Sequence, residues 1–366
     1  MKKTGIAIIG LGDMGTGHLR GFDALEGARI VAMCDLNPTA AERARKQLHN
    51  NDPHYYNHYQ DVLSDPSVEA VVIAVPGHLH EELLLQSIRA GKHVLLEKPV
   101  TINPEGYKRV KAEADKSDCV IQIGLVYRYS SLYRTIARKL QEENELGHVM
   151  LGWCKEYRQC FPQEPWFYDR NKSGGTIIEK DCHHFDIFNW MIGSRPKRVF
   201  AFGGQHVYKN GEGCLVNCSY SISPPRVIND ISIVDHAIVA IEYENGAKAN
   251  LNLCMYLKPE NASGDGLEFG FIGTNGKQLV IRRDEEFGIS GGERAECFKY
   301  SLNRREDGGD FGHIGCQRQR TEFMACIEQG LKPYADIQRS EDALLTAFAA
   351  ERSIEEGRVV QLSEFY

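Results

Sequence analysis

Two carboxylates, an imidazole and an indole share one narrow stripe of a helix expected over residues 178–192. At about 100° per residue, Glu179, His183, Asp186 and Trp190 fall in a sector about 60° wide. Apolar residues gather on a different side, which should pack into the core: Ile178, Cys182, Phe185, Phe188 and Ile192. A histidine with carboxylates beside it is suited to proton transfer. An ordinary polar helix face would show the same pattern, so the rest of the chain must decide.

The N-terminal motif Gly10-Leu11-Gly12-Asp13-Met14-Gly15 stands between an expected strand, 5–9, and an expected helix. Such glycines allow a tight turn and let backbone amides approach a pyrophosphate at the helix N-terminus. The next expected strand, 29–34, ends on Asp35. An acid at that place binds ribose hydroxyls and repels a 2′-phosphate, so the motif predicts NAD rather than NADP as cofactor. The alternative is that Asp35 is only a turn residue.

Strands and helices continue to alternate through the N-terminal part. Further strands are expected over 68–75, 93–96 and 120–124, with helices between them. This alternation predicts a doubly wound parallel sheet, whose ligands bind beyond the carboxyl ends of the strands. Unusual residues gather at those ends, and we expect them to bind the cofactor together with the glycine motif 10–15: Asp35, Pro76, His80, Glu97 and Lys98.

Lys98 is the most informative of these residues, because it follows a buried strand and is fixed by Pro99. Near an oxidised nicotinamide ring, which is cationic, its ammonium form would be disfavoured, and partial burial would have the same effect. Such a lysine can polarise or deprotonate a substrate hydroxyl near neutral pH. A surface lysine paired with Glu97 is the simpler alternative.

Composition restricts the class of protein. The chain of 366 residues has a net charge of −7 and no long run of lysine or arginine, which argues against nucleic acid as a partner. The sequence contains neither a signal peptide nor an apolar stretch that suits a membrane span. Eleven cysteines, an odd number without a C-x-x-C pair, are typical of a reducing compartment. We therefore expect a cytoplasmic protein with no membrane partner.

After Gly193 the hydrophobic period changes from helical to alternating. Asn245-Gly246 and Asn275-Gly276 are typical hairpin turns between strands expected at 198–208, 214–222, 232–243, 247–257, 267–273 and 277–283. These strands should form one antiparallel sheet with one face on helices. Its open face predicts a homo-oligomer, either a dimer or a tetramer. Residues 304–310 should form a loop before His313, and the last helix should start at Ser340.

The fold class is therefore α/β in two parts. Residues 1–124 should form a Rossmann domain with a doubly wound parallel sheet that binds NAD. Residues 125–366 should form an α+β domain with a large open antiparallel sheet, used for substrate binding and oligomerisation.

These segments resemble the Gfo/Idh/MocA oxidoreductases, the family of glucose–fructose oxidoreductase and inositol dehydrogenase. The resemblance extends over nearly the whole chain. The matching motifs are Gly10-x-Gly12-x-x-Gly15, Asp35, Val75-Pro76-x-x-x-His80, the run 90–99 ending in Glu97-Lys98-Pro99, and Gly174-Gly175 before Glu179-x-x-x-His183-x-x-Asp186. The resemblance implies a tightly held nicotinamide cofactor and a sugar or cyclitol substrate. It also implies that Lys98 and His183 form the catalytic pair.

Two residues depart from the family pattern. Glu179 stands where the family usually has aspartate, and Asp181 stands where it usually has glycine. The surplus carboxylate leaves open a metal site built from Glu179, Asp181, His183 or His184. Adjacent His183 and His184 point apart on a helix, so we assign no metal.

We therefore expect an NAD-dependent dehydrogenase that oxidises a secondary hydroxyl of a sugar, glycoside or cyclitol by hydride transfer to nicotinamide. His183 would take the hydroxyl proton, Lys98 would stabilise the developing alkoxide, and Glu179 would orient His183 or bind a second hydroxyl. The candidate substrate contacts are Tyr127, Arg158, Trp166 and Asp186.

Two other functions remain open. An NAD-recycling redox glycosidase would oxidise its substrate transiently, eliminate the aglycone and reduce the product, with an extra base from residue 179 or 181. A non-enzymatic NAD-binding regulator would not need both Lys98 and His183.

Overall fold

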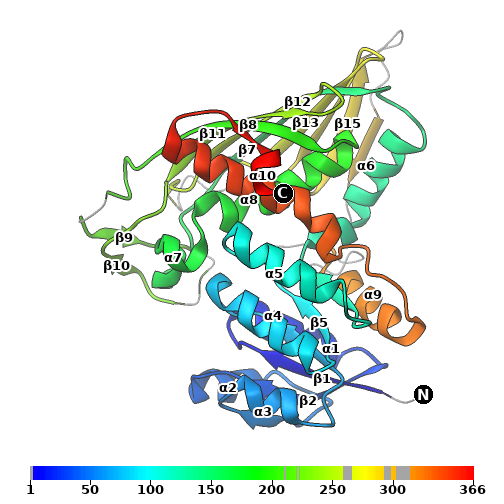
Figure 1. Ribbon diagram of the computed structural model, residues 1–366, viewed down its shortest axis with the longest axis vertical. Coiled ribbons are helices and arrows are strands. Elements are labelled where there is room, and N and C mark those ends of the chain that lie inside the picture. The colour runs from blue at the N-terminus through cyan, green and yellow to red at the C-terminus, as the bar shows by residue number, and fades with distance from the viewer. Residues whose placement is uncertain are drawn as a thin grey trace. The chain divides into compact units, whose positions relative to one another are not determined.

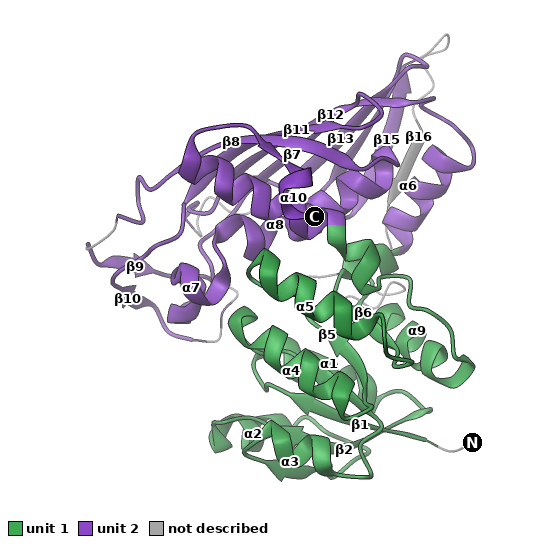
Figure 2. Ribbon diagram, viewed as in Figure 1, with its two compact units in different colours: residues 1–130, 305–341 green, residues 131–304, 342–366 purple. Residues whose placement is uncertain are grey.

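The computed structural model describes residues 3–209, 212–219, 221, 223–258, 266–291, 298–301 and 314–366 (Figure 1). The expected loop over 304–310 and His313 lie outside the described residues. The chain forms two compact units, coloured green and purple in Figure 2. Unit 1 contains residues 1–130 and 305–341, and unit 2 contains residues 131–304 and 342–366. Each unit is built from two chain segments, whereas the sequence suggested one division after residue 124.

A parallel sheet forms the centre of unit 1. Within the described ranges it has six strands in the order β3-β2-β1-β4-β5-β6. The strands are β1 (Thr4–Ile9), β2 (Ala28–Cys34), β3 (His54–Tyr56), β4 (Ala70–Ile73), β5 (His93–Leu96) and β6 (Ile121–Ile123). This strand order is that of a doubly wound nucleotide-binding fold and confirms the predicted fold class. Strand β3 was not predicted, because its three residues are exposed or half-buried and form no apolar run.

Six α-helices in the described part of unit 1 accompany this sheet: α1 (Asp13–Asp23), α2 (Pro38–Arg45), α3 (Tyr59–Ser64), α4 (His80–Arg89), α5 (Pro104–Ala114) and α9 (Cys316–Gln329). Short 3₁₀ helices are η1 (Gly77–Leu79) and η2 (Val126–Tyr129). An Asn-Pro pair starts both α2 and α5, where Asn37 and Asn103 accept a backbone hydrogen bond from the first turn. The core packs Phe22 of α1 and Phe323 of α9 with strand residues such as Ile8.

A larger sheet forms the centre of unit 2. Over the described residues it has nine strands in the order β16-β15-β14-β13-β7-β12-β11-β8-β17. Their bounds are β7 (Val149–Tyr157), β8 (Pro196–Gly204), β11 (His236–Tyr243), β12 (Lys248–Cys254), β13 (Glu268–Gly273), β14 (Lys277–Arg282), β15 (Glu286–Gly291), β16 (Phe298–Ser301) and β17 (Val360–Gln361). Strands β7 and β12 are parallel, and the other neighbours are antiparallel. The large, mostly antiparallel sheet confirms the prediction for the second part of the chain.

The expected strand over 214–222 does not belong to this sheet, so that detail was wrong. Strand β9 (Cys214–Val216) pairs with β10 (Arg226–Ile228) in a separate two-stranded sheet. Leu215 and Val227 lie opposite each other there, and both side chains are exposed. An alternating pattern indicates a strand but does not identify its partner, because pairing depends on distant contacts.

The main helix of unit 2 is α8 (Thr176–Ile192), which packs on β7. Phe188 of α8 contacts the rings of Phe269 and Phe271 edge-on, with centroids 5.5 and 6.1 Å apart. Every residue of α8 except Asn189 is buried. The other helices among the described residues are α6 (Ser131–Gln141), α7 (Arg170–Ser173), η3 (Pro165–Tyr168), η5 (Leu362–Phe365) and α10 (Ile337–Glu356), whose first residues belong to unit 1.

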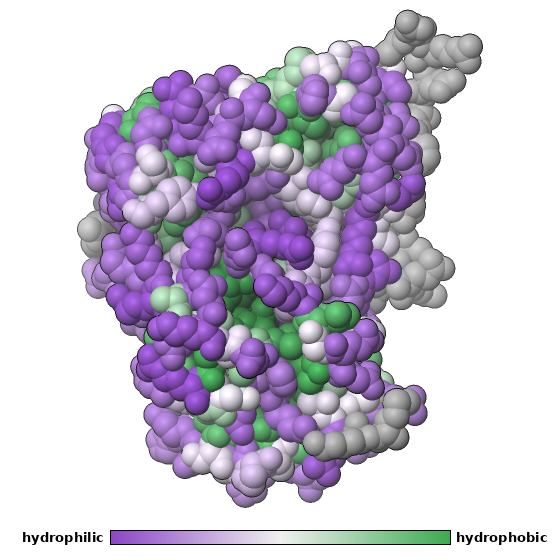
Figure 3. Space-filling view, turned by 45° about the vertical axis from the view of Figure 1, so that its right-hand side comes forward, coloured by the Kyte–Doolittle hydropathy of each residue, from purple (hydrophilic) through white to green (hydrophobic). Residues whose placement is uncertain are grey.

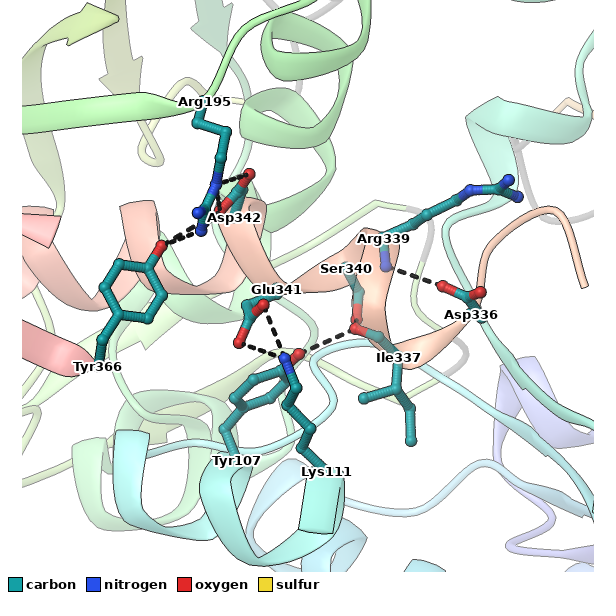
Figure 4. Close-up of polar contacts among 10 residues, drawn as sticks. All are labelled: Tyr107, Lys111, Arg195, Asp336, Ile337, Arg339, Ser340, Glu341, Asp342 and Tyr366. Atoms are coloured by element: carbon teal, nitrogen blue, oxygen red, sulfur yellow. Dashed lines mark hydrogen bonds and ion pairs between the residues drawn. The ribbon is translucent and has the colours of Figure 1, made fainter. Parts of the chain in front are cut away.

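Helix α10 begins before the serine that was expected to cap it. The carboxylate of Asp336 accepts a hydrogen bond from the backbone N–H of Arg339 at 2.8 Å, as an N-cap does (Figure 4). Ser340 is buried inside the helix, and its hydroxyl donates to the carbonyl of Ile337 at 2.7 Å. The prediction was wrong because Asp336 lies at the spacing that satisfies the first turn.

The next two residues of α10 form ion pairs with side chains of different units. Within unit 1, Glu341 accepts hydrogen bonds from Lys111, with 3.0 Å to each carboxylate oxygen (Figure 4). Within unit 2, Asp342 accepts from Arg195 at 2.9 Å, and Arg195 also contacts the hydroxyl of Tyr366. These ion pairs hold the start of α10 in unit 1 and its continuation in unit 2.

Hydrophilic side chains cover most of the face drawn in Figure 3, and hydrophobic ones form separate groups. Among the helices in the described ranges, none combines the length and the apolar character that crossing a bilayer requires.

Candidate active site

The glycine motif forms the turn from β1 into α1. Gly12 is the N-cap residue of the helix and has no side chain that could cap it. A Cβ at Gly12 would meet none of the described atoms within 4 Å, whereas one at Gly15 would lie 1.8 Å from the carbonyl oxygen of Gly10. Gly15 is therefore required for packing, while Gly12 leaves space beside the helix N-terminus. This arrangement fits a pyrophosphate, with Asp13 and Met14 half-buried in the first turn.

The carboxylate of Asp35 is fixed at the end of β2. Its Oδ2 accepts a hydrogen bond from the backbone N–H of Leu11 at 2.8 Å, and its Oδ1 accepts from that of Asn37 at 2.8 Å. Each carboxylate oxygen can accept a further hydrogen bond, which suits ribose hydroxyls. The adjacent Leu36, which was not predicted to take part in the site, is 74% exposed.

Glu97, Lys98 and Pro99 follow the end of β5. Glu97 is buried, and its Oε1 lies 2.8 Å from Nε2 of His18 on α1. Lys98 is half-buried. His18 was not predicted to belong to the site, because its partner is far away in the chain and gives no local pattern.

His80 lies in the first turn of α4 and is only 1% exposed. Its Nδ1 is 2.6 Å from the carbonyl oxygen of Pro99, and its Nε2 is 2.8 Å from that of Val75, the residue before Pro76. Both ring nitrogens of His80, which was predicted to bind the cofactor, therefore face backbone carbonyls.

In unit 2, the stripe predicted on α8 is buried along its whole length. Glu179, His183, Asp186 and Trp190 are between 2% and 8% exposed. Glu179 and His183 are one helical turn apart on the same face, the spacing at which a carboxylate can orient an imidazole. Burial of three titratable groups on one side of a helix needs polar partners, which is typical of a functional site.

The other predicted substrate contacts lie in different segments. Arg158 follows β7, and its Nη1 is 3.3 Å from Oε1 of Glu156. Trp166 of η3 is half-buried and stacks on Phe167 with ring centroids 3.7 Å apart. Tyr127 belongs to η2 of unit 1 and is buried.

A buried ion cluster connects the end of β7 to α8, and its centre, Glu156, was not predicted from the sequence. The Glu156 carboxylate lies 3.3 Å from Nζ of Lys180 and 3.6 Å from Nε2 of His184. Burial alone would raise the pKa of Glu156, but Lys180, His184 and Arg158 lower it to about 2. Glu156 is therefore ionised at neutral pH. Side chains along a strand alternate between its two faces, and Glu156 lies on the same buried face of β7 as Cys154. This alternation could have predicted that Glu156 is buried.

Asp181, the departure from the family pattern, is a partner of His184. Its Oδ1 lies 2.7 Å from Nδ1 of His184, and both side chains are fully buried. Burial raises the pKa of Asp181, and the hydrogen bond with His184 opposes that effect. In the part of the chain that the structure describes, no three histidine, cysteine or acidic side chains are placed to hold a metal ion.

The N-terminus of α8 receives a carboxylate from α10. Oε1 of Glu351 accepts a hydrogen bond from the backbone N–H of Ile177 at 3.0 Å. A Cβ at Gly175 would lie 2.3 Å from the same oxygen, so this close approach requires glycine. Burial raises the pKa of Glu351 to about 7, although Arg170 and the backbone of Ile177 act in the opposite direction.

Replacing Glu351 with glutamine should therefore change how stability depends on pH. Because the folded-state pKa lies above the ordinary value, the stability contributed by protonated Glu351 is complete below about pH 4.5 and is lost as the pH rises through about 7. Glu351→Gln keeps an acceptor oxygen and cannot ionise. At pH 8 we expect the variant to be more stable than the wild type by on the order of 1–3 kcal/mol.

Urea denaturation at pH 5 and pH 8 measures this difference. The control is Glu328→Gln, because Glu328 is exposed near the end of α9. The prediction would be contradicted if the free energy of unfolding fell equally in the wild type and in Glu351→Gln between pH 5 and pH 8.

The fold and the nucleotide loop define an NAD-binding oxidoreductase. A parallel sheet in the order 3-2-1-4-5-6, an open glycine turn at α1 and an acid at the end of β2 are the features of that class. The family model described as an oxidoreductase family with an NAD-binding Rossmann fold matches residues 4–125. The model of the GFO/IDH/MocA C-terminal domain matches residues 135–278. The chain belongs to the Gfo/Idh/MocA oxidoreductase family.

Similar proteins include dehydrogenases of cyclitols and sugars. Myo-inositol 2-dehydrogenase of Thermotoga maritima is 24% identical over 98% of each chain. An NAD⁺-dependent scyllo-inositol 2-dehydrogenase of Bacillus subtilis is 23% identical over 97% of this chain and 95% of its own. The structure of levoglucosan dehydrogenase with NADH and levoglucosan is similar with a TM-score of 0.81 at 19% identity, covering 99% of this chain and all of the other.

Proposed function

We propose that this chain is an NAD-dependent dehydrogenase that oxidises a secondary hydroxyl of a sugar or cyclitol. The observation that carries the proposal is the buried face of α8, where Glu179 and His183 lie one turn apart in a chain with an NAD-binding domain. The inositol and levoglucosan dehydrogenases among its relatives support the substrate class. The substrate is then a small polyhydroxylated molecule.

In this proposal, His183 accepts the hydroxyl proton on one ring nitrogen. Nζ of Lys98 stabilises the negative charge that develops on the substrate oxygen, and Glu179 orients the imidazole. Bound NAD supplies the hydride acceptor. Arg158, Trp166, Asp186 and Tyr127 are the proposed substrate contacts, and the reducing cytoplasm is the proposed location because of the eleven cysteines.

The structure weakens one argument for a redox glycosidase. That reaction needs an additional base, for which the sequence offered residues 179 and 181. Asp181 is fully buried and bonded to His184, so it does not provide an accessible base. Of the two carboxylates, only Glu179 then remains a candidate for the additional base.

The decisive experiment incubates the protein and NAD with myo-inositol, scyllo-inositol, levoglucosan and a set of glycosides. Both NADH absorbance and released sugars are measured. A dehydrogenase accumulates one NADH for each substrate oxidised. Release of free sugar from a glycoside without net NADH would overturn the proposal in favour of the glycosidase, and absence of both products over a broad substrate set would favour the regulator.

We also propose that a second copy of the chain covers the open face of the large sheet. Phe202 of β8 and Ile238 of β11 lie opposite each other, 67% and 55% exposed. Leu151 of β7 is 39% exposed. An apolar sheet face of this kind is normally covered, and a homo-oligomer covers it symmetrically.

Glutamate at Ile238 should therefore dissociate the oligomer, because it would bury an unpaired charge in the interface. We expect a dimer or tetramer for the wild type and a shift of at least about tenfold in the dissociation constant for Ile238→Glu. Analytical ultracentrifugation measures both. Val227→Glu is the matched control, because Val227 is also 55% exposed but belongs to the separate β9–β10 sheet. A monomeric wild type would contradict the proposal.

A further inference from the structure

Lys98 stands between two residues that are each bound to a buried histidine. On its N-terminal side, Glu97 lies 2.8 Å from Nε2 of His18. On its C-terminal side, the carbonyl oxygen of Pro99 lies 2.6 Å from Nδ1 of His80. Both histidines are at most 2% exposed.

The N-terminal side of Lys98 is also fixed by close packing. A Cβ at Gly124 would lie 2.7 Å from Oε2 of Glu97, so the carboxylate fills the space beside that glycine. The N–H of Gly124 donates to the carbonyl of Leu96 at 2.7 Å. Movement of the Lys98 backbone is therefore restricted at Glu97, and the contact of Pro99 with His80 restrains it on the other side.

His80 connects the ends of two neighbouring strands. Its Nε2 lies 2.8 Å from the carbonyl oxygen of Val75, beyond β4, while Pro99 lies beyond β5. Carbonyl oxygens only accept hydrogen bonds, and a neutral imidazole has one N–H to donate. Burial lowers the pKa of His80, although both carbonyls and Glu97 oppose this effect, so the ring with a single N–H is favoured. The contact with Pro99 is the shorter of the two, so we place this N–H on Nδ1.

We propose that His80 is a positioning residue, which holds Lys98 in its reactive place through the Nδ1–H bond to the carbonyl of Pro99. This inference rests on the proposed role of Lys98. Both ring nitrogens of His80 face backbone carbonyls and its side chain is 1% exposed, so its proposed effect on the reaction passes through the backbone of Pro99. A displacement of about 1 Å at a reacting group can cost up to about 10²-fold in rate.

Asparagine and glutamine at position 80 separate the two contacts. The amide nitrogen of asparagine is attached to Cγ, as Nδ1 is, whereas that of glutamine lies one bond farther out, near the place of Nε2. His80→Asn should keep kcat within about threefold, and His80→Gln should lower it at least about tenfold. Titration with NAD should give affinities within about threefold of the wild type for both, since position 80 lies outside the glycine motif 10–15.

The probes are NAD with the substrate found by the inositol and levoglucosan screen. Retained kcat in His80→Gln with loss in His80→Asn would overturn the proposal, and so would a parallel loss of NAD affinity in both. A readout that needs no turnover is the ¹⁵N spectrum of the histidine-labelled protein without ligands. A neutral His80 protonated at Nδ1 is expected, and a proton on Nε2 alone would overturn the assignment.

The Lys98→Ala background separates this inference from the proposed function. In that background His80→Gln should reduce residual turnover by less than twofold, because its effect passes through Lys98. An undiminished tenfold loss there would overturn the positioning role alone. A Lys98→Ala enzyme with full activity would instead overturn the proposed role of Lys98.

Discussion

Alanine at Lys98 or at His183 should each reduce turnover by about 10²–10⁴-fold and leave NAD affinity nearly unchanged. The reason is that the two side chains are proposed to act on one proton transfer and on the charge it creates, rather than on binding of the nucleotide. For the same reason the double variant should lose much less than the product of the two single losses. Steady-state kinetics and NAD titration measure these effects.

Exposed residues of the same type provide matched controls. Lys108 lies on α5 of unit 1, and His148 lies just before β7 of unit 2. The variants Lys108→Ala and His148→Ala should both keep wild-type turnover. His184→Ala should instead lower stability, because His184 is buried and bonded to Asp181. If folded His184→Ala lost as much turnover as His183→Ala, the wrong histidine would have been assigned.

Alanine at Asp35 should move cofactor preference toward NADP by at least about tenfold in the ratio of kcat/KM values. A hydrogen bond to a charged group is worth about 1.5–3 kcal/mol, and a tenfold ratio corresponds to about 1.4 kcal/mol. Asp35→Ala removes the acceptor for ribose hydroxyls and the charge that repels a 2′-phosphate. It also removes the acceptor of the Leu11 and Asn37 amides, so NAD binding should weaken as well.

The control for this prediction is Glu42→Ala, because Glu42 is an exposed acid on α2 in the same unit. Kinetics with NAD and NADP for the two variants and the wild type give the comparison. If the ratio of the kcat/KM values for the two cofactors were the same in Asp35→Ala and Glu42→Ala, Asp35 would not determine the preference for NAD.

The nucleotide-binding fold could be predicted because its information is local. Each buried parallel strand is a short apolar run, and the glycine turn and Asp35 lie at fixed distances from the first two strands. Strand β3 was missed because an edge strand of half-buried residues has no apolar run. The partner of β9 was wrong because hydrophobic alternation does not encode which strand lies alongside.

The candidate site could be predicted only in part for a related reason. Helical periodicity places Glu179, His183 and Asp186 on one side of α8, but it does not show what packs against the other sides. Lys180 and His184 also proved to be buried, beside Glu156. A buried charge requires a partner, and that partner lies in another segment of the chain, which one helix's periodicity cannot identify.

The passage of the chain through the two units limits how the protein can be divided or recombined. Unit 1 is completed only by residues 305–341, which bring Phe323 against Phe22 and the carbonyl of Ala335 to the N–H of Ile123. A gene fragment that stops at residue 130 would therefore encode an incomplete nucleotide-binding half. Exchange of this half between relatives requires crossovers near residues 130, 304 and 341, so cofactor preference should change in evolution by substitutions at positions such as Asp35 more easily than by shuffling of a module.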